Sequence, residues 1–102
     1  MDTDDLSEKA WEIIARAAIV SDTLKTELGA RCYRYENEGD WLRGVRKFLH
    51  QIVEEPKKYV DYWDLEHEEG VTATMIKNIA AELTCQVQEI LAKPLSWRNR
   101  KR

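Results

Sequence analysis

The sequence has few of the residues that build loop-rich or covalently cross-linked proteins. Its 102 residues include four glycines, two prolines, two cysteines and one phenylalanine. Glycine and proline at this level are too scarce for a barrel of many short strands and turns. Two cysteines, Cys32 and Cys85, are too few for a disulfide scaffold and form no zinc-ribbon pattern. The 34% charged and 43% hydrophobic residues are typical of one soluble domain.

The sequence also lacks a long apolar run. Its longest uncharged apolar stretch, residues 17–20, is far shorter than the ~20 residues that cross a bilayer. The aspartate-rich start has neither the positive region nor the apolar region of a secretory signal. Together with unpaired thiols, these features predict a cytoplasmic protein that does not act on a membrane.

Charge is unevenly distributed along the chain, whose formal net charge is −3. Residues 54–70 carry seven acids and two bases, whereas residues 31–53 carry five bases and three acids. Residues 94–102 carry four bases and no acid. This pattern argues against binding of nucleic acid or anionic lipid over the whole surface, and it indicates separate acidic and basic surfaces.

Apolar residues recur at steps of three and four over most of the chain, which predicts helices. The first such stripe consists of Leu6, Ala10, Ile13, Ala17, Val20 and Leu24. A helix is expected to begin after Thr3 or Asp5, and Ser21 with Asp22 can interrupt it as a new N-cap. Whether residues 4–35 form one helix or two stays open. The spacing also matches a short coiled-coil seam, so a homodimer is an alternative to packing within the chain.

Further helices are expected on both sides of Pro56. After a polar loop at 36–40, Asp40 is expected to cap a helix that Pro56 ends. The aromatic and acidic segment at about 56–66 has no second strand with which to pair, which favours a short helix closed by Gly70.

The strongest periodic run is the last one, which begins at Thr72 or Thr74 and is stopped by Pro94. Taken together, the stripes predict an all-α, single-domain bundle of four to five helices, mostly antiparallel. Residues 1–93 are expected to form this bundle, and residues 94–102 a basic C-terminal tail.

No pattern in the sequence predicts a catalytic residue, a cofactor or a metal site. Glycine-rich phosphate loops and the serine nucleophile elbow are absent. Acids and His67 crowd residues 61–69, but di-iron and EF-hand spacings are missing, which favours a solvated acidic segment. Cys32 lies beside Arg31 and Arg34, which would lower the pKa of an exposed thiol, yet no histidine base lies nearby. Both cysteines are expected in the core, and the protein is expected not to be an enzyme.

Aromatic residues among acids make residues 56–66 the leading candidate for a partner-binding surface. Packing of these aromatics within the bundle is the alternative. Exposed aromatics supply contact area, and flanking charges select an oppositely charged partner. The expected function is a non-catalytic protein-interaction or regulatory module of the adaptor, assembly-factor or inhibitor type, whose partner is another protein or a second copy. The residues expected to carry it are Tyr59, Asp61, Tyr62, Trp63 and Asp64.

Nucleic-acid binding is the alternative function, because basic side chains neutralise phosphates and tryptophan stacks on bases. The residues expected to carry it are Arg43, Arg46, Lys47, Trp97, Arg98, Arg100, Lys101 and Arg102. Residues 79–85 resemble the first half of a helix-turn-helix, but Thr84 stands where its turn usually has glycine. Helical periodicity through 84–87 favours an unbroken helix. The basic tail is also able to fold back onto acidic residues 54–70 or to stay solvated.

Overall fold

The computed structural model describes residues 1–92, and all regular structure in them is helical. The helices are α1 (Glu8–Val20), α2 (Asp22–Arg31), α3 (Glu38–Glu54), α4 (Pro56–Trp63), α5 (Leu65–Glu69) and α6 (Ala73–Ala92). Two 3-10 turns, η1 (Thr3–Asp5) and η2 (Cys32–Arg34), precede α1 and α3. The predicted all-α bundle is confirmed, with six helices within residues 1–92 where four to five were expected. The predicted tail at 94–102 lies outside the described residues.

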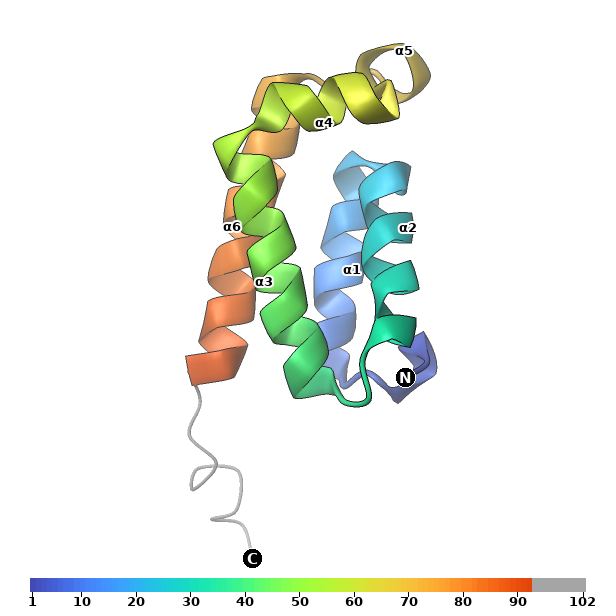
Figure 1. The fold of residues 1–102 in the computed structure, drawn as a ribbon, viewed down its shortest axis with the longest axis vertical. Helices are drawn as coiled ribbons and strands as arrows, with labels where there is room; N and C mark the ends of the chain where they lie inside the picture. Colours follow the sequence, from blue (N-terminus) through green and yellow to red (C-terminus); the bar gives the residue numbers. More distant parts are fainter. Residues whose placement is uncertain (93–102) are drawn as a thin grey trace, which may run out of the picture.

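Four long helices form the bundle, and α4 crosses one end of it (Figure 1). α1 and α2 form an antiparallel hairpin, α3 and α6 are antiparallel neighbours, and α6 also packs against α1. α4 and α5 lie at the end of the bundle where α6 begins. Ala92, the last residue of α6, lies at the opposite end (Figure 1).

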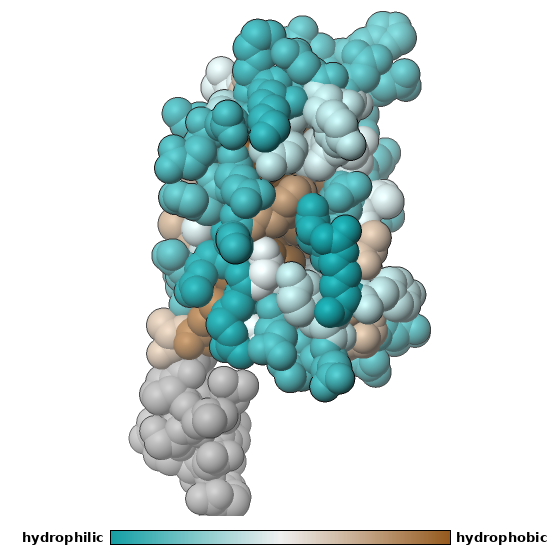
Figure 2. Space-filling model, in the orientation of Figure 1, coloured by the Kyte–Doolittle hydropathy of each residue, from teal (hydrophilic) through white to brown (hydrophobic). Residues whose placement is uncertain are grey.

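The first apolar stripe is buried inside the chain. Five of its six residues are buried, and Val20 is half-buried. Packing within the bundle therefore accounts for the spacing that also matches a coiled-coil seam. The face shown in Figure 2 is mainly hydrophilic, with hydrophobic side chains visible in a narrow opening at its centre. The largest fully buried side chains are Trp41, Ile13, Ile14, Leu24, Leu28, Leu49, Ile52, Leu65, Ile76 and Leu83.

Ser21 separates α1 from α2 and so answers the question that the sequence left open. Its backbone is extended, its amide donates to the carbonyl of Ala17, and its hydroxyl accepts from the amide of Leu24 at 3.1 Å. One residue therefore ends the first helix and caps the second. The start of α1 was predicted wrongly, because Ser7 is the N-cap and accepts from the amide of Ala10.

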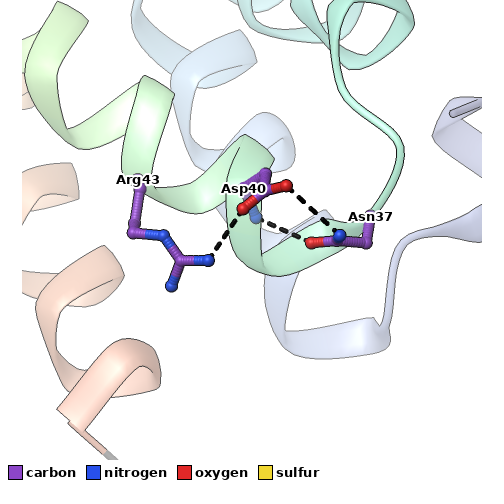
Figure 3. Close-up of polar contacts among 3 residues, drawn as sticks. All are labelled: Asn37, Asp40 and Arg43. Carbon is purple, nitrogen blue, oxygen red and sulfur yellow. Dashed lines mark hydrogen bonds and ion pairs between the residues drawn. The ribbon is translucent and has the colours of Figure 1, made fainter.

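The start of α3 also differs from the prediction. Asn37, not Asp40, is the N-cap, and its side-chain oxygen accepts from the amide of Asp40 at 2.9 Å (Figure 3). The side-chain amide of Asn37 donates to the Asp40 carboxylate, which also accepts from Arg43 at 2.8 Å. Asp40 thus lies in the first turn of the helix, where its charge favours the positive end of the helix dipole.

α6 is one unbroken helix, as the periodicity through 84–87 predicted, so residues 79–85 are not the first half of a helix-turn-helix. The hydroxyl of Thr84 donates to the carbonyl of Ala80 at 2.7 Å, a bond that a threonine makes inside a continuous helix. Thr72 caps the start of α6, since its hydroxyl accepts from the amide of Met75. The predicted stop at Pro94 lies outside the described residues. Of the helices in residues 1–92, none combines the length and the apolar character that crossing a bilayer requires.

Trp41 fixes α3 against α2. Its side chain is fully buried, and its indole nitrogen donates to the carbonyl of Leu28 at 3.1 Å. Leu28 lies in the last turn of α2, where the carbonyls lack partners within the helix. The indole ring therefore fills part of the core, and its N–H group supplies a hydrogen-bond donor for the Leu28 carbonyl.

Replacing Trp41 with Phe is expected to lower the free energy of unfolding by about 2–3 kcal/mol, because it shrinks a buried ring and leaves the Leu28 carbonyl without its donor. The matched control is Trp11→Phe, since Trp11 is 40% exposed on α1. That change is expected to stay within about 0.5 kcal/mol. Urea denaturation followed by circular dichroism measures both, and equal losses would contradict the role given to Trp41.

Candidate partner-binding surface

The five residues predicted to bind a partner lie on α4 and in the turn that follows it, and they divide into two groups. Tyr59 and Trp63 are half-buried, whereas Asp61, Tyr62 and Asp64 are exposed. Tyr62 is 81% exposed, more than any other aromatic side chain in residues 1–92. These residues, with Glu66 and His67 of α5, are referred to below as the acidic–aromatic surface.

The half-buried aromatics hold α4 against α3. The rings of Tyr59 and Trp63 lie 6.1 and 6.0 Å from the ring of Phe48, and 5.2 Å from each other. The Arg31 guanidinium lies 3.7 Å from the centre of the Phe48 ring. Burial, reinforced by the neighbouring positive charge of Arg34, lowers the pKa of Arg31. Of the five predicted residues, Tyr59 and Trp63 therefore pack against α3, and the other three face solvent.

Asp64 breaks the predicted helix at 56–66 into α4 and α5. Its backbone is left-handed, with φ 52° and ψ 43°, and it is the one non-glycine residue with positive φ in residues 1–92. An L-residue adopts this conformation at a cost, which aspartate and asparagine tolerate best. Gly70, with φ 67°, ends α5 as predicted. The strained residue lies in the middle of the acidic–aromatic surface.

A shallow depression is present on this surface, lined by Val60, Asp61, Asp64, Glu66 and His67. Val60 is buried, whereas the three carboxylates and the imidazole are exposed. Carboxylates beside one aliphatic side chain suit the charged end and the aliphatic stem of a lysine or arginine side chain. Sequence reasoning weighed Glu66 and His67 only as possible metal ligands and left them out of the partner-binding set, because only the turn at Asp64 brings α5 beside α4.

Some of the carboxylates on this surface already have a positive or polar neighbour. Lys57 lies 3.3 Å from Asp61 within α4. The Nδ1 atom of His67 lies 3.2 Å from Asp64 and 3.6 Å from Glu68. Such exposed pairs are each worth about 0–1 kcal/mol, so a stronger donor can replace them.

The ligand atoms of Asp64, His67 and Glu68 lie within 4.8 Å of one another. All three side chains are exposed, and exposed acidic groups of this kind are common without a metal ion. The expectation that this segment is a solvated acidic surface stays a prediction.

Glu69 holds α5 against the junction of α1 and α2. Its carboxylate accepts from the hydroxyl of Ser21 at 2.6 Å, from the Thr23 amide at 3.0 Å and from the Thr23 hydroxyl at 2.5 Å. Burial opposes its ionisation, but these hydrogen bonds outweigh burial and lower the pKa of Glu69 below its usual value. Nothing in the local sequence distinguishes Glu69 from its acidic neighbours, because its partners lie 46 and 48 residues away.

The two cysteines differ in environment. Cys32 is fully buried, as expected, and burial raises the pKa of its thiol. The neighbouring arginines therefore do not activate it. Cys85 was expected in the core and is exposed instead, because its position on α6 faces away from α1 and α3. A buried, protonated thiol is a poor nucleophile.

The basic residues predicted for nucleic-acid binding are only partly described. Arg43, Arg46 and Lys47 follow one side of α3 at helical spacing, but Arg43 is paired with Asp40 (Figure 3) and Arg46 is half-buried. Lys47 is exposed. Nucleic-acid binding stays a prediction, because the rest of its residues lie outside residues 1–92. These are Trp97, Arg98, Arg100, Lys101 and Arg102.

Comparison with known proteins gives no relative from which a function can be inferred: no family model, curated protein or solved structure matches this chain. The functional argument therefore rests on the chain's own residues.

Replacing Glu69 with Gln is expected to lower the free energy of unfolding by about 1–2 kcal/mol near pH 7, since a neutral amide accepts these hydrogen bonds less strongly. Because the pKa of Glu69 is lower in the folded state, its contribution is complete above about pH 4.5 and is lost as the pH falls through the folded pKa. The variant is therefore expected to lose less stability on acidification than the wild type.

The matched control for this prediction is Glu68→Gln, whose side chain is exposed. It is expected to change stability by no more than about 0.5 kcal/mol at either pH. Thermal and urea unfolding at pH 7 and pH 3.5 measure both variants. If Glu68→Gln and Glu69→Gln behaved alike, the carboxylate would not be the contact that holds α5.

Replacing Asp64 with Gly is expected to raise the free energy of unfolding by about 0.5–1 kcal/mol, because glycine adopts the left-handed conformation without strain. Asp61→Gly is the control, since Asp61 lies inside α4 with negative φ. That change is expected to lower stability by about 0.5 kcal/mol. Opposite signs in urea denaturation support strain at Asp64, and a loss in both variants contradicts it.

Proposed function

We propose that this protein is a small non-catalytic interaction module that binds a basic protein segment through the acidic–aromatic surface of α4 and α5. The observation that carries the proposal is the exposure of Tyr62, a residue that is 81% exposed among carboxylates at one end of the bundle. Solvation of a large aromatic ring is unfavourable, and such rings are frequent anchors in protein interfaces.

The charges around Tyr62 support a basic partner. Asp61, Asp64 and Glu66 line the depression, and their exposed pairs with Lys57 and His67 are weak enough to exchange for a partner's cation. Carboxylates around an aromatic anchor also speed the encounter with a positively charged segment. The partner is therefore selected by sign of charge and by an apolar contact with Tyr62.

The way in which α4 is held supports a preformed surface. Tyr59 and Trp63 pack on Phe48, and Glu69 fixes α5 to the neighbouring hairpin. Contacts on the inner side therefore leave Tyr62 in place without a partner. A surface that is ordered before binding loses less entropy when the partner arrives. The strain at Asp64 fits this proposal, since strained backbone is concentrated at functional sites.

The test is binding of short arginine- and lysine-rich peptides that contain one tryptophan, compared with peptides of equal length in which glutamate replaces each cation. Only the basic peptides are expected to bind, with shifts in nuclear magnetic resonance spectra centred on residues 60–67. Tyr62→Ala is expected to weaken binding about fivefold or more. The affinity is also expected to fall as the salt concentration rises.

The matched control is Tyr33→Ala, since Tyr33 is 68% exposed but lies in η2, outside the acidic–aromatic surface. This change is expected to leave peptide affinity unaltered, and circular dichroism checks that both variants stay folded. Equal binding of acidic and basic peptides, or equal losses in the two tyrosine variants, would refute the proposed function.

A further inference from the structure

We propose that the basic segment 97–102 of one copy binds the acidic–aromatic surface of a second copy, so that the protein associates head to tail. This inference rests on the proposed function, and it names the partner of that surface. The occupant is a segment of the chain that lies outside the described residues.

The first argument is charge and shape. The depression is lined by Asp61, Asp64 and Glu66 together with buried Val60, and exposed Tyr62 follows Asp61 in α4. The segment 97–102 offers one tryptophan and four cations without an acid. Arginine forms paired hydrogen bonds with carboxylates, and a tryptophan ring stacks on an exposed tyrosine. Each feature of the surface thus has a counterpart in the segment.

The second argument is reach, which keeps Trp97 and most of the segment from docking within one chain. α6 has 20 residues, a length of about 30 Å, and it runs from the end that carries α4 and α5 to the opposite end (Figure 1). Trp97 follows Ala92 by five residues, which span at most about 18 Å when fully extended. Trp97 therefore cannot return to Tyr62 of its own chain. The residues up to Arg102 span about 36 Å at most, so after covering the length of α6 only the last one or two residues remain to contact the surface.

These two arguments lead to an asymmetric association. The donor segment follows α6, which ends opposite the acceptor surface, so a contact between two copies leaves one segment and one surface unoccupied. Such head-to-tail contacts extend into chains unless the rotation between copies closes a ring. The contacts are mainly between exposed charges, which makes the association dependent on protein and salt concentration.

The experiment is sedimentation velocity of the full chain, with and without nuclease treatment, from about 10 to about 500 µM, at about 20 mM and about 500 mM salt. The mean mass is expected to rise with protein concentration at low salt and to return to 12.0 kDa at high salt. Two variants reverse two charges each: Asp61→Lys with Glu66→Lys on the surface, and Arg98→Glu with Arg100→Glu in the segment. Each variant alone is expected to stay monomeric.

Mixing the two variants gives the decisive outcome. In the mixture, the normal segment of one variant meets the normal surface of the other, and the reversed segment meets the reversed surface. Association is therefore expected to return on mixing, although each variant alone stays monomeric, and a chain that carries both reversals is also expected to regain association. Circular dichroism checks that each variant is folded, and Lys9→Glu with Lys25→Glu, on α1 and α2, controls for net charge.

Several results would overturn the inference. The inference is wrong if the wild-type protein stays monomeric, or if association survives reversal of the segment charges. It is also wrong if nuclease removes the association, because nucleic acid then bridges the copies. A peptide with the sequence of residues 94–102 separates this failure from failure of the proposed function. If other basic peptides bind near Tyr62 and this one does not, only the choice of partner is wrong. If no basic peptide binds there, both proposals fail.

Discussion

Burial of the apolar face of α6 is the contact on which the bundle depends. This helix packs against both α3 and α1, so its buried side chains join the two helical pairs into one core. Burying one such large side chain contributes about 1.5–3 kcal/mol before entropy is subtracted. α4 also packs against α6, which places the candidate surface on the same framework. The buried residues of α6 are Ile76, Ile79, Ala80, Leu83 and Val87.

Three local features then fix the end of the bundle that carries the acidic–aromatic surface. Phe48 receives the rings of Tyr59 and Trp63, Asp64 turns the chain between α4 and α5, and Glu69 joins α5 to the α1–α2 junction. The packing on Phe48 removes apolar area from water, and the turn at Asp64 ends a helix. Glu69 supplies the acceptor for backbone and hydroxyl donors. With these contacts made on the inner side, the ring of Tyr62 is left in solvent.

The sequence predicted the elements well and their ends less well. Periodicity identified the long helices because one residue in three or four must face the core, and Pro56 and Gly70 marked boundaries by their backbone chemistry. Near the start of α3, Asn37 and Asp40 are both good caps, and sequence alone does not decide between them. The aromatic segment was located correctly, but which of its rings are buried depends on Phe48, more than ten residues earlier in the chain.

The sequence by itself determined an all-α fold and the placing of acids and aromatics in one segment, because these follow from spacing and composition along the chain. Only the tertiary structure decided that Tyr59 and Trp63 face α3 and that Tyr62 faces solvent. It also decided that Glu69 accepts hydrogen bonds from the junction of α1 and α2. The physical reason is distance along the chain: a ring or a carboxylate is buried by whatever element packs against it, and that element lies elsewhere in the sequence.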